Sequence, residues 1–219
     1  MTWPWAAWIR DAVPDPGDPY LNSWILWWDW HQTFHDPLNL FQGTILFPYR
    51  YTLAFSENNF GLAILLFPLY ALGARPLTAH GVAMLLGYLF SGYGAFRLTR
   101  TMTGSTGAAW VAGIAFAFVP YRFHQISHVN YTFTAWVPLV LEALVLFTRR
   151  RTWARATWLG VAFLMNGLTC IHWLILSAPP LAVAAMILVL RDGIENDRAF
   201  WRRGGAAVGA ASLLLLPFL

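Results

Sequence analysis

The sequence predicts an all-α fold, a multi-pass bundle of transmembrane helices with two further helices lying along one face of the membrane. The chain has 219 residues, of which 58% are hydrophobic and 11% charged, whereas soluble domains carry about 25% charged residues. Aromatic residues make up 17% and include 13 tryptophans, as expected where indole rings line both membrane interfaces. Apolar runs long enough to cross a bilayer alternate with short arginine clusters.

Residues 1–76 are predicted to form an outer-face region that does not cross the membrane. Residues 1–57 hold six of the ten acidic residues. Apolar residues at helical spacing over 20–35 predict an amphipathic helix whose indoles lie at headgroup depth. The apolar run 60–72 contains Pro68 and is shorter than the roughly 20 residues of a span. It therefore predicts a second juxtamembrane helix.

Residues 77–219 are predicted to be the transmembrane region. Its segments are expected at about 77–98, 106–121, 131–148, 156–171, 173–190 and 206–219. The break between the fourth and fifth segments falls either near residues 170–173 or at Pro179-Pro180. Because the chain ends inside an apolar run, we expect it to be the N-terminal part of a longer protein and to be inactive alone.

The arginines predict the orientation of the bundle. All 14 basic residues are arginine, and ten of them lie in three loops between apolar runs. The positive-inside rule places those loops in the cytoplasm. Residues 121–130 are then on the outer face, and the acidic N-terminal region joins them there if 60–72 does not cross. The net charge of +4 comes without a basic aromatic groove, so no nucleic-acid partner is expected.

Asp18 is the leading candidate for chemistry. It lies between Gly17 and Pro19, so a rigid turn presents its carboxylate beside the membrane. Such a carboxylate could take a proton from an acceptor hydroxyl or help hold a metal ion. It could also cap the following helix, with Pro19 at the first helical position, and the two roles are compatible.

Residues 121–130 hold the densest set of polar candidates. Arg122 has the planar fork that suits a lipid phosphate, and it could equally be an anchor that reaches the headgroups. His124 and His128 are four residues apart, so together with Asp18 they could complete an acid–base set or hold a divalent metal ion. Cys170 is the only cysteine, which excludes a disulfide framework or a Cys-based metal site.

Several further polar residues could act in the structure or in the chemistry. Glu57 is a possible second active-site carboxylate, or a favourable charge at the start of the next helix. His31 and His35 could bind a metal together with Asp36, or they are hydrated interfacial histidines. Glu142 lies inside a predicted span, where we expect a structural role near Arg149. Asp29 is expected on the solvated face of its helix.

Three stretches together resemble the GT-C superfamily of bacterial polytopic glycosyltransferases. They are residues 17–27 (GDPYLNSWILW), 47–57 (FPYRYTLAFSE) and 119–128 (VPYRFHQISH). The resemblance implies two juxtamembrane helices in the first outer loop, Asp18 as the catalytic carboxylate and a polyprenyl-phosphate sugar as donor. The chain departs from the family pattern where Pro19 follows Asp18 in place of a second acid. It also departs where His124, His128 and Asn130 stand at positions at which some members have an aspartate.

These observations lead to a functional hypothesis. An enzyme of the bacterial inner membrane would move a hexose or pentose from a polyprenyl-phosphate donor to an acceptor on the outer face. Asp18 would take the acceptor proton, while Arg122 with His124 or His128 would face the donor phosphate, directly or through a divalent metal ion. The sequence does not identify the acceptor. The alternative is a non-enzymatic transporter, flippase or cell-envelope assembly protein, which needs polar residues lining the spans themselves.

Overall fold

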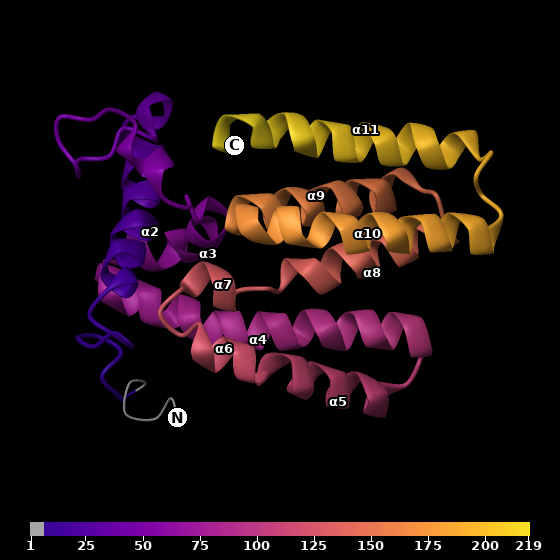
Figure 1. Ribbon diagram of the computed structural model, residues 1–219, viewed down its shortest axis with the longest axis horizontal. Helices are drawn as coiled ribbons and strands as arrows, with labels where there is room; N and C mark the ends of the chain where they lie inside the picture. Colours follow the sequence, from indigo (N-terminus) through magenta and orange to yellow (C-terminus); the bar gives the residue numbers. More distant parts are fainter. Residues whose placement is uncertain (1–6) are drawn as a thin grey trace. The chain divides into compact units, whose positions relative to one another are not determined.

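The computed structural model describes residues 7–219, and these residues form helices and turns, with no strand among them (Figure 1). The predicted all-α class is therefore confirmed. The helices are α2 (Asp18–His35), α3 (Phe60–Ala71), α4 (Pro76–Thr103), α5 (Thr106–Ala117), α6 (Pro120–His124), α7 (Val129–Thr132), α8 (Trp136–Arg149), α9 (Trp153–Thr169), α10 (Ile171–Asp192) and α11 (Arg198–Leu215). Short 3-10 turns occupy Pro37–Asn39, Thr52–Phe55 and Leu216–Phe218.

The chain divides into two compact units of opposite charge. Among the described residues, unit 1 comprises 7–88, 119–133 and 168–170, and unit 2 comprises 89–118, 134–167 and 171–219. Unit 1 holds six acidic and four basic residues, whereas unit 2 holds four acidic and ten basic residues. The division differs from the predicted boundary at residue 76, because the segment 119–133 packs with the N-terminal helices.

Unit 1 is organised around the contact between α2 and α3, which lie side by side (Figure 1). Its small core contains Ile25, Trp28 and Leu53. The Trp28 indole nitrogen donates to the Leu40 carbonyl oxygen at 2.9 Å, which ties α2 to the chain that follows it. α3 is apolar around most of its circumference. One apolar face packs against α2, and apolar residues on the other faces are exposed.

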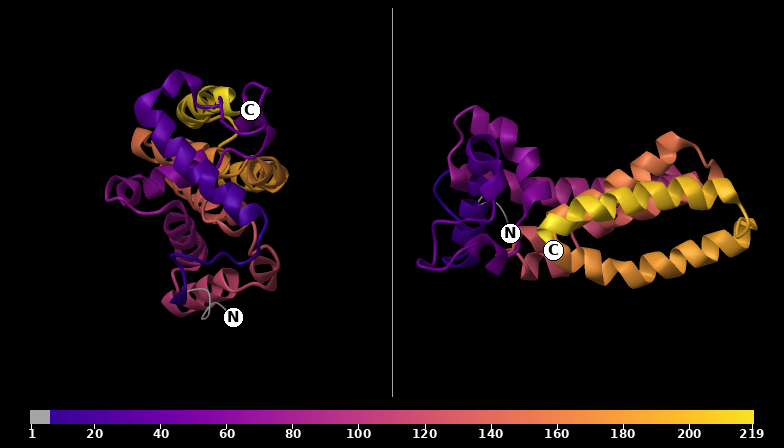
Figure 2. Two further views of the ribbon diagram at one scale, coloured as in Figure 1. Left: turned by 90° about the vertical axis from the view of Figure 1, so that its left-hand side faces the viewer. Right: turned by 90° about the horizontal axis from the view of Figure 1, so that it is seen from above.

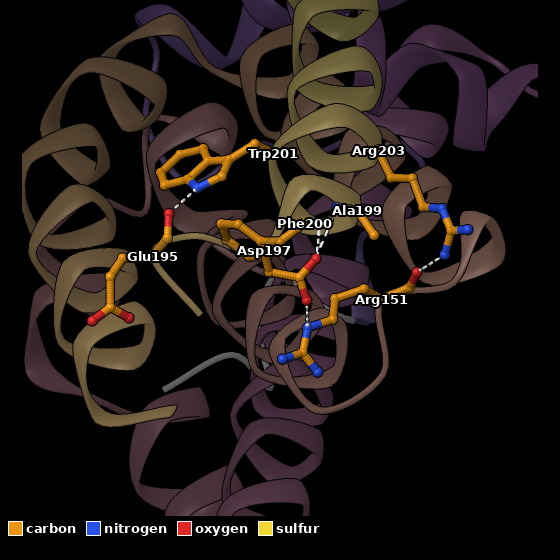
Figure 3. Close-up of polar contacts among 7 residues, drawn as sticks. All are labelled: Arg151, Glu195, Asp197, Ala199, Phe200, Trp201 and Arg203. Atoms are coloured by element: carbon orange, nitrogen blue, oxygen red, sulfur yellow. Dashed lines mark hydrogen bonds and ion pairs between the residues drawn. The ribbon is translucent and has the colours of Figure 1, made fainter. Parts of the chain in front are cut away.

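Helix ends follow signals that are present in the sequence. Gly73, Gly104 and Gly193 follow α3, α4 and α10 with positive φ angles of 82°, 72° and 61°. Only glycine adopts that conformation without strain, so it commonly terminates helices. Ser105 accepts a hydrogen bond from the Ala108 amide and begins α5. Asp197 accepts from the amides of residues 199 and 200 and begins α11 (Figure 3).

Unit 2 has a hydrophobic core that is contributed by α8 to α11. Phe147 of α8 stacks on Phe200 of α11 with ring centroids 5.2 Å apart. A Cβ placed on Gly204 would lie 2.9 Å from the Phe147 ring, so the absence of a side chain permits this packing. α10 and α11 run in opposite directions from the connection between them (Figure 2).

Glu142 of α8 forms the main buried ion pair of unit 2. Its Oε1 atom accepts from Arg97 at 3.1 and 2.9 Å and from the Thr101 hydroxyl at 3.0 Å. The expected structural role is borne out by these contacts. The partner is Arg97 of α4 and not Arg149, because α4 packs against α8 at the level of Glu142.

Two helical stretches are long and apolar enough to cross a membrane, judged by length and composition. They are Val129–Arg149, which comprises α7 and α8, and Ile171–Asp192, which is α10. Most of the first stretch is buried, so α8 is interior, whereas most of the second is not, so α10 presents an apolar surface outward. The other predicted spans are helical but shorter or less apolar.

Two boundaries differ from the prediction, and the break between α9 and α10 falls at the first of its two predicted positions. α5 ends at Ala117, before the predicted end at 121. The predicted span 131–148 is interrupted, because the Thr134 amide donates to the Ser91 hydroxyl at 3.1 Å and not to a carbonyl within the helix. The break between α9 and α10 falls at Cys170, and the two adjacent prolines lie inside α10.

Candidate functional site

Asp18 is the first residue of α2. Gly17 is the N-cap residue, and no side chain makes a capping hydrogen bond there. The capping role considered for Asp18 is therefore wrong: the helix begins one residue earlier than Pro19, which places Asp18 inside its first turn. A negative charge in this turn still interacts favourably with the helix dipole. The carboxylate is left available for another partner.

The second segment of the site, residues 119–133, folds as two short helices. Pro120 begins α6, which ends at His124, and His128 is the N-cap residue of α7. His124 and His128 lie on different helices, because Gln125 ends the first helix and a turn separates the two histidines. His124 is exposed and His128 is half-buried.

Asp18 and His128 meet, although 110 positions separate them in the chain. The His128 Nε2 and Asp18 Oδ2 atoms are 2.7 Å apart. The His128 Nδ1 atom is buried without a hydrogen-bond partner among the described residues, so we place the ring proton on Nε2, where it is donated to the carboxylate. The Asp18 side chain is 56% exposed and the His128 side chain is 36% exposed, so a substrate can reach the pair.

A second carboxylate is held by the same segment. The Asn130 side-chain amide donates to Glu57 Oε2 at 2.8 Å. His128 and Asn130 thus bind one carboxylate each: Asp18 at the start of α2 and Glu57 shortly before α3. Glu57 also lies close to Tyr131. Glu57 and Cys170 present potential metal-ligand atoms within 4.8 Å of each other.

Arg122 lies beneath this segment rather than on its surface. Its side chain is 1% exposed, and its guanidinium donates to the Thr132 carbonyl oxygen. Burial lowers the pKa of Arg122 to about 10, while the neighbouring Tyr88 and Tyr121 oppose the shift. The guanidinium remains charged at neutral pH, and in this conformation it bonds across its own loop.

The histidines of α2 lie on one face of the helix, as their spacing predicts. The His31 and His35 rings stack with centroids 4.1 Å apart and an interplanar angle of 6°. His35 Nδ1 donates to the His31 carbonyl oxygen at 2.7 Å, and Asp36 accepts from Asn39. Parallel stacked rings do not aim two nitrogens at one ion, so this geometry favours the structural interpretation.

The sequence interpretation missed the burial of Asp29. The residue is 0% exposed, at the interface of α2 with α3, and its Oδ1 atom accepts from Asn58 at 3.2 Å. Burial raises the pKa of Asp29 well above its usual value, and the Asn58 hydrogen bond opposes that shift. The polar pair Asn58-Asn59, directly before an apolar helix, was a sequence signal for buried polar contacts with α2. Asn58 bonds to Asp29 and Asn59 bonds to Asn22, both on α2.

The structure therefore gathers Asp18, His128, Asn130 and Glu57 into one polar site of unit 1, with Arg122 buried beside it. It leaves His124 exposed, with no contact to the other members identified. Comparisons with protein-family models, with curated proteins and with solved structures return no match. The functional argument rests on the geometry and chemistry of this site.

Proposed function

We propose that the chain carries the active-site region of an integral membrane glycosyltransferase of the bacterial inner membrane. The enzyme moves a sugar from a polyprenyl-phosphate donor to an acceptor on the outer face. The observation that carries the proposal is the Asp18–His128 contact at 2.7 Å. It joins two segments that the arginine pattern independently assigns to the same side of a membrane.

The chemistry requires one proton acceptor and one stabiliser of negative charge. The acceptor hydroxyl attacks the anomeric carbon, its O–H proton passes to Asp18, and the bond between that carbon and the phosphate oxygen breaks. The polyprenyl phosphate leaves with an additional negative charge. Asp18 is an exposed carboxylate and can fill the first role. His128 beside it can stabilise the departing phosphate when its Nε2–H turns from Asp18 to a phosphate oxygen.

Glu57 and Arg122 have supporting roles in this proposal. The Asn130–Glu57 hydrogen bond fixes the position of the segment that carries His128. Arg122 holds the same segment through the Thr132 carbonyl. A direct contact between Arg122 and the donor phosphate requires the guanidinium to exchange that carbonyl for a phosphate oxygen. Exposed His124 can approach the phosphate without such a change.

The proposed divalent metal ion fits the described residues poorly at the two histidines. No group of three potential ligand atoms close enough to hold an ion contains His124 or His128 among residues 7–219. The Nε2 atom of His128 is already engaged by Asp18. We therefore derive no step through a metal ion.

The rival class, a transporter or flippase, needs polar residues that line the spans themselves. Glu142 lies inside a stretch that could cross a membrane, and its Oε1 atom accepts hydrogen bonds from Arg97 and Thr101. Its buried Oε2 atom has no hydrogen-bond partner among the described residues. We prefer the enzyme because of the Asp18–His128 contact, and an assay of sugar transfer separates the two classes.

The test is sugar transfer by membranes that contain the complete natural protein. The donors are a panel of radiolabelled polyprenyl-phosphate hexoses and pentoses, and the readout is label released from the lipid. We expect Asp18→Asn to lower the rate by roughly 10²–10⁴-fold, because a positioned general base contributes about that much. Asp15→Asn, in the same loop, is the matched control and should retain the rate.

Two results would contradict the proposal. Wild-type-like transfer by Asp18→Asn would remove this carboxylate from the mechanism. Absence of transfer from every donor, with the protein folded in the membrane, would reject glycosyl transfer for this donor class and favour the non-enzymatic alternative.

A further inference from the structure

A second site emerges from the packing of α9 against α11 in unit 2. The two helices run in the same direction (Figure 1) and approach closely at Gly160, where an added Cβ would lie 2.7 Å from the Ala207 carbonyl oxygen. Small residues let the backbones meet at this point, and beside it they leave an open groove of about 290 Å³. The groove is lined by Trp153 and Leu164 of α9 and by Ala206, Ala210 and Leu214 of α11, among others.

The groove is apolar and faces outward. Leu214 is 61% exposed and Val161 is 41% exposed, and both line it. Ala206 and Ala210 are exposed as well. Flexible hydrocarbon chains fit an elongated groove of this kind, because they need no hydrogen-bond partners and fill irregular space.

One end of the groove is basic. Trp153 lies at that end, half-exposed, and the Arg203 guanidinium lies 5.8 Å from the centre of its ring. Arg202 and Arg203 precede Ala206 and Ala207 by one turn of α11, so they extend the same side of the helix beyond the apolar part.

The positive charge at this end exceeds what nearby acids neutralise. Residues 149–203 contain eight arginines against three acidic residues. Asp197 pairs with Arg151 at 2.8 Å and also caps α11, while Arg203 donates to the Arg151 carbonyl oxygen (Figure 3). These contacts hold the start of α11 against the start of α9. Arg202 is exposed, and no acidic residue of the described chain pairs with it.

We propose that this groove binds one anionic phospholipid, with an acyl chain along Gly160 and Ala210 and the phosphate at Arg202 and Arg203. Trp153 would lie at the boundary between chain and headgroup, where indole rings are favoured. Basic pockets between helices on the cytoplasmic side recognise anionic headgroups. The positive charge here favours a lipid whose headgroup has a phosphate but no positively charged group beside it. The proposal shares with the glycosyltransferase hypothesis only the membrane location.

The experiment measures lipid retained by the detergent-purified protein in native mass spectrometry. The protein is titrated with phosphatidylglycerol and, in parallel, with phosphatidylcholine of the same acyl chains. We expect preferential retention of one phosphatidylglycerol. Arg202→Gln should weaken that retention about fivefold and leave phosphatidylcholine unchanged, since one arginine near an anionic headgroup contributes roughly that factor. Ala210→Phe, at an exposed position, should fill the groove and lower the retention of both lipids.

Arg191→Gln is the matched control, because it removes the same charge from an arginine already paired with Asp192. Equal retention of the two lipids by the unmodified protein would overturn the proposal. An effect of Arg191→Gln as large as that of Arg202→Gln would also overturn it, since diffuse charge would then explain binding. Ala206→Phe repeats the groove test at a second exposed position, so that a folding defect in one variant does not decide the result.

Discussion

Replacing Asp29 with asparagine should stabilise the protein at neutral pH. Asp29 is fully buried, and its Oδ2 atom has no hydrogen-bond partner among the described residues. A buried carboxylate without a cation is costly, so burial favours the protonated form of this group in the folded protein. Asparagine has nearly the same shape and carries no charge at any pH.

The direction of the pH effect follows from the raised pKa of Asp29 in the folded state. An unfolded aspartate has a pKa of about 3.9. Between that value and the folded pKa, the folded state binds one more proton than the unfolded state, so stability falls as pH rises. The slope is at most about 1.4 kcal/mol per pH unit. Below the unfolded pKa the contribution is constant, and the variant gains nothing there.

The assay is thermal unfolding of the detergent-purified protein at a series of pH values from about 4 to 8. For a chain of this size the slope corresponds to roughly 3–5 °C per pH unit. We expect the melting temperature of Asp29→Asn to exceed that of the unmodified protein by an amount that grows with pH. Asp36→Asn, at an exposed residue just beyond the same helix, should show no such trend. A parallel pH dependence of Asp29→Asn and the unmodified protein would refute the reasoning.

Two further predictions concern packing and charge. Arg97→Leu leaves buried Glu142 without its cation and should lower the free energy of unfolding by about 3 kcal/mol, and adding Glu142→Gln should recover most of that loss. Chemical denaturation of both variants in detergent measures the effect, and additivity of the two changes would contradict it. Gly61→Ala should destabilise by about 1–3 kcal/mol, because the new Cβ would lie 2.6 Å from the Thr169 hydroxyl. Gly205→Ala is the control: its new Cβ, inside α11, would have no atom within 4 Å, and it should stabilise the protein by about 0.5–1 kcal/mol. If both alanine variants changed stability in the same direction, the close approach at Gly61 would be absent.

The positions of the helices were largely predictable because local signals define them. The two N-terminal helices were expected at 20–35 and 60–72 and are found at Asp18–His35 and Phe60–Ala71. Apolar runs bounded by glycine and proline give such boundaries without tertiary information. The interruption before α8 was not predictable, since the Ser91 hydroxyl that receives the Thr134 amide lies 43 residues away in the chain.

The candidate site was predictable in part, through an argument about membrane sides rather than about contacts. Counting arginine clusters placed Asp18 and His128 on one face, and the structure brings them to 2.7 Å. The partners of the individual side chains could not be predicted. Arg122 bonds beneath its own loop, and Asp29 faces α3 although an amphipathic pattern assigns a carboxylate to water. In both cases, burial by a distant segment decides the environment.

The juxtaposition of Asp18 and His128 can be measured directly by crosslinking. In a background of Cys170→Ser, the pair Asp18→Cys and His128→Cys is treated in membranes with a short bis-maleimide, and proteolysis followed by electrophoresis shows whether the two peptides are joined. The control pair is Asp36→Cys and His128→Cys, because residue 36 lies about 27 Å along α2 from residue 18. The structure predicts a crosslink for the first pair and none for the control. Failure of the first pair to react, with each single cysteine reactive, would contradict the existence of the site.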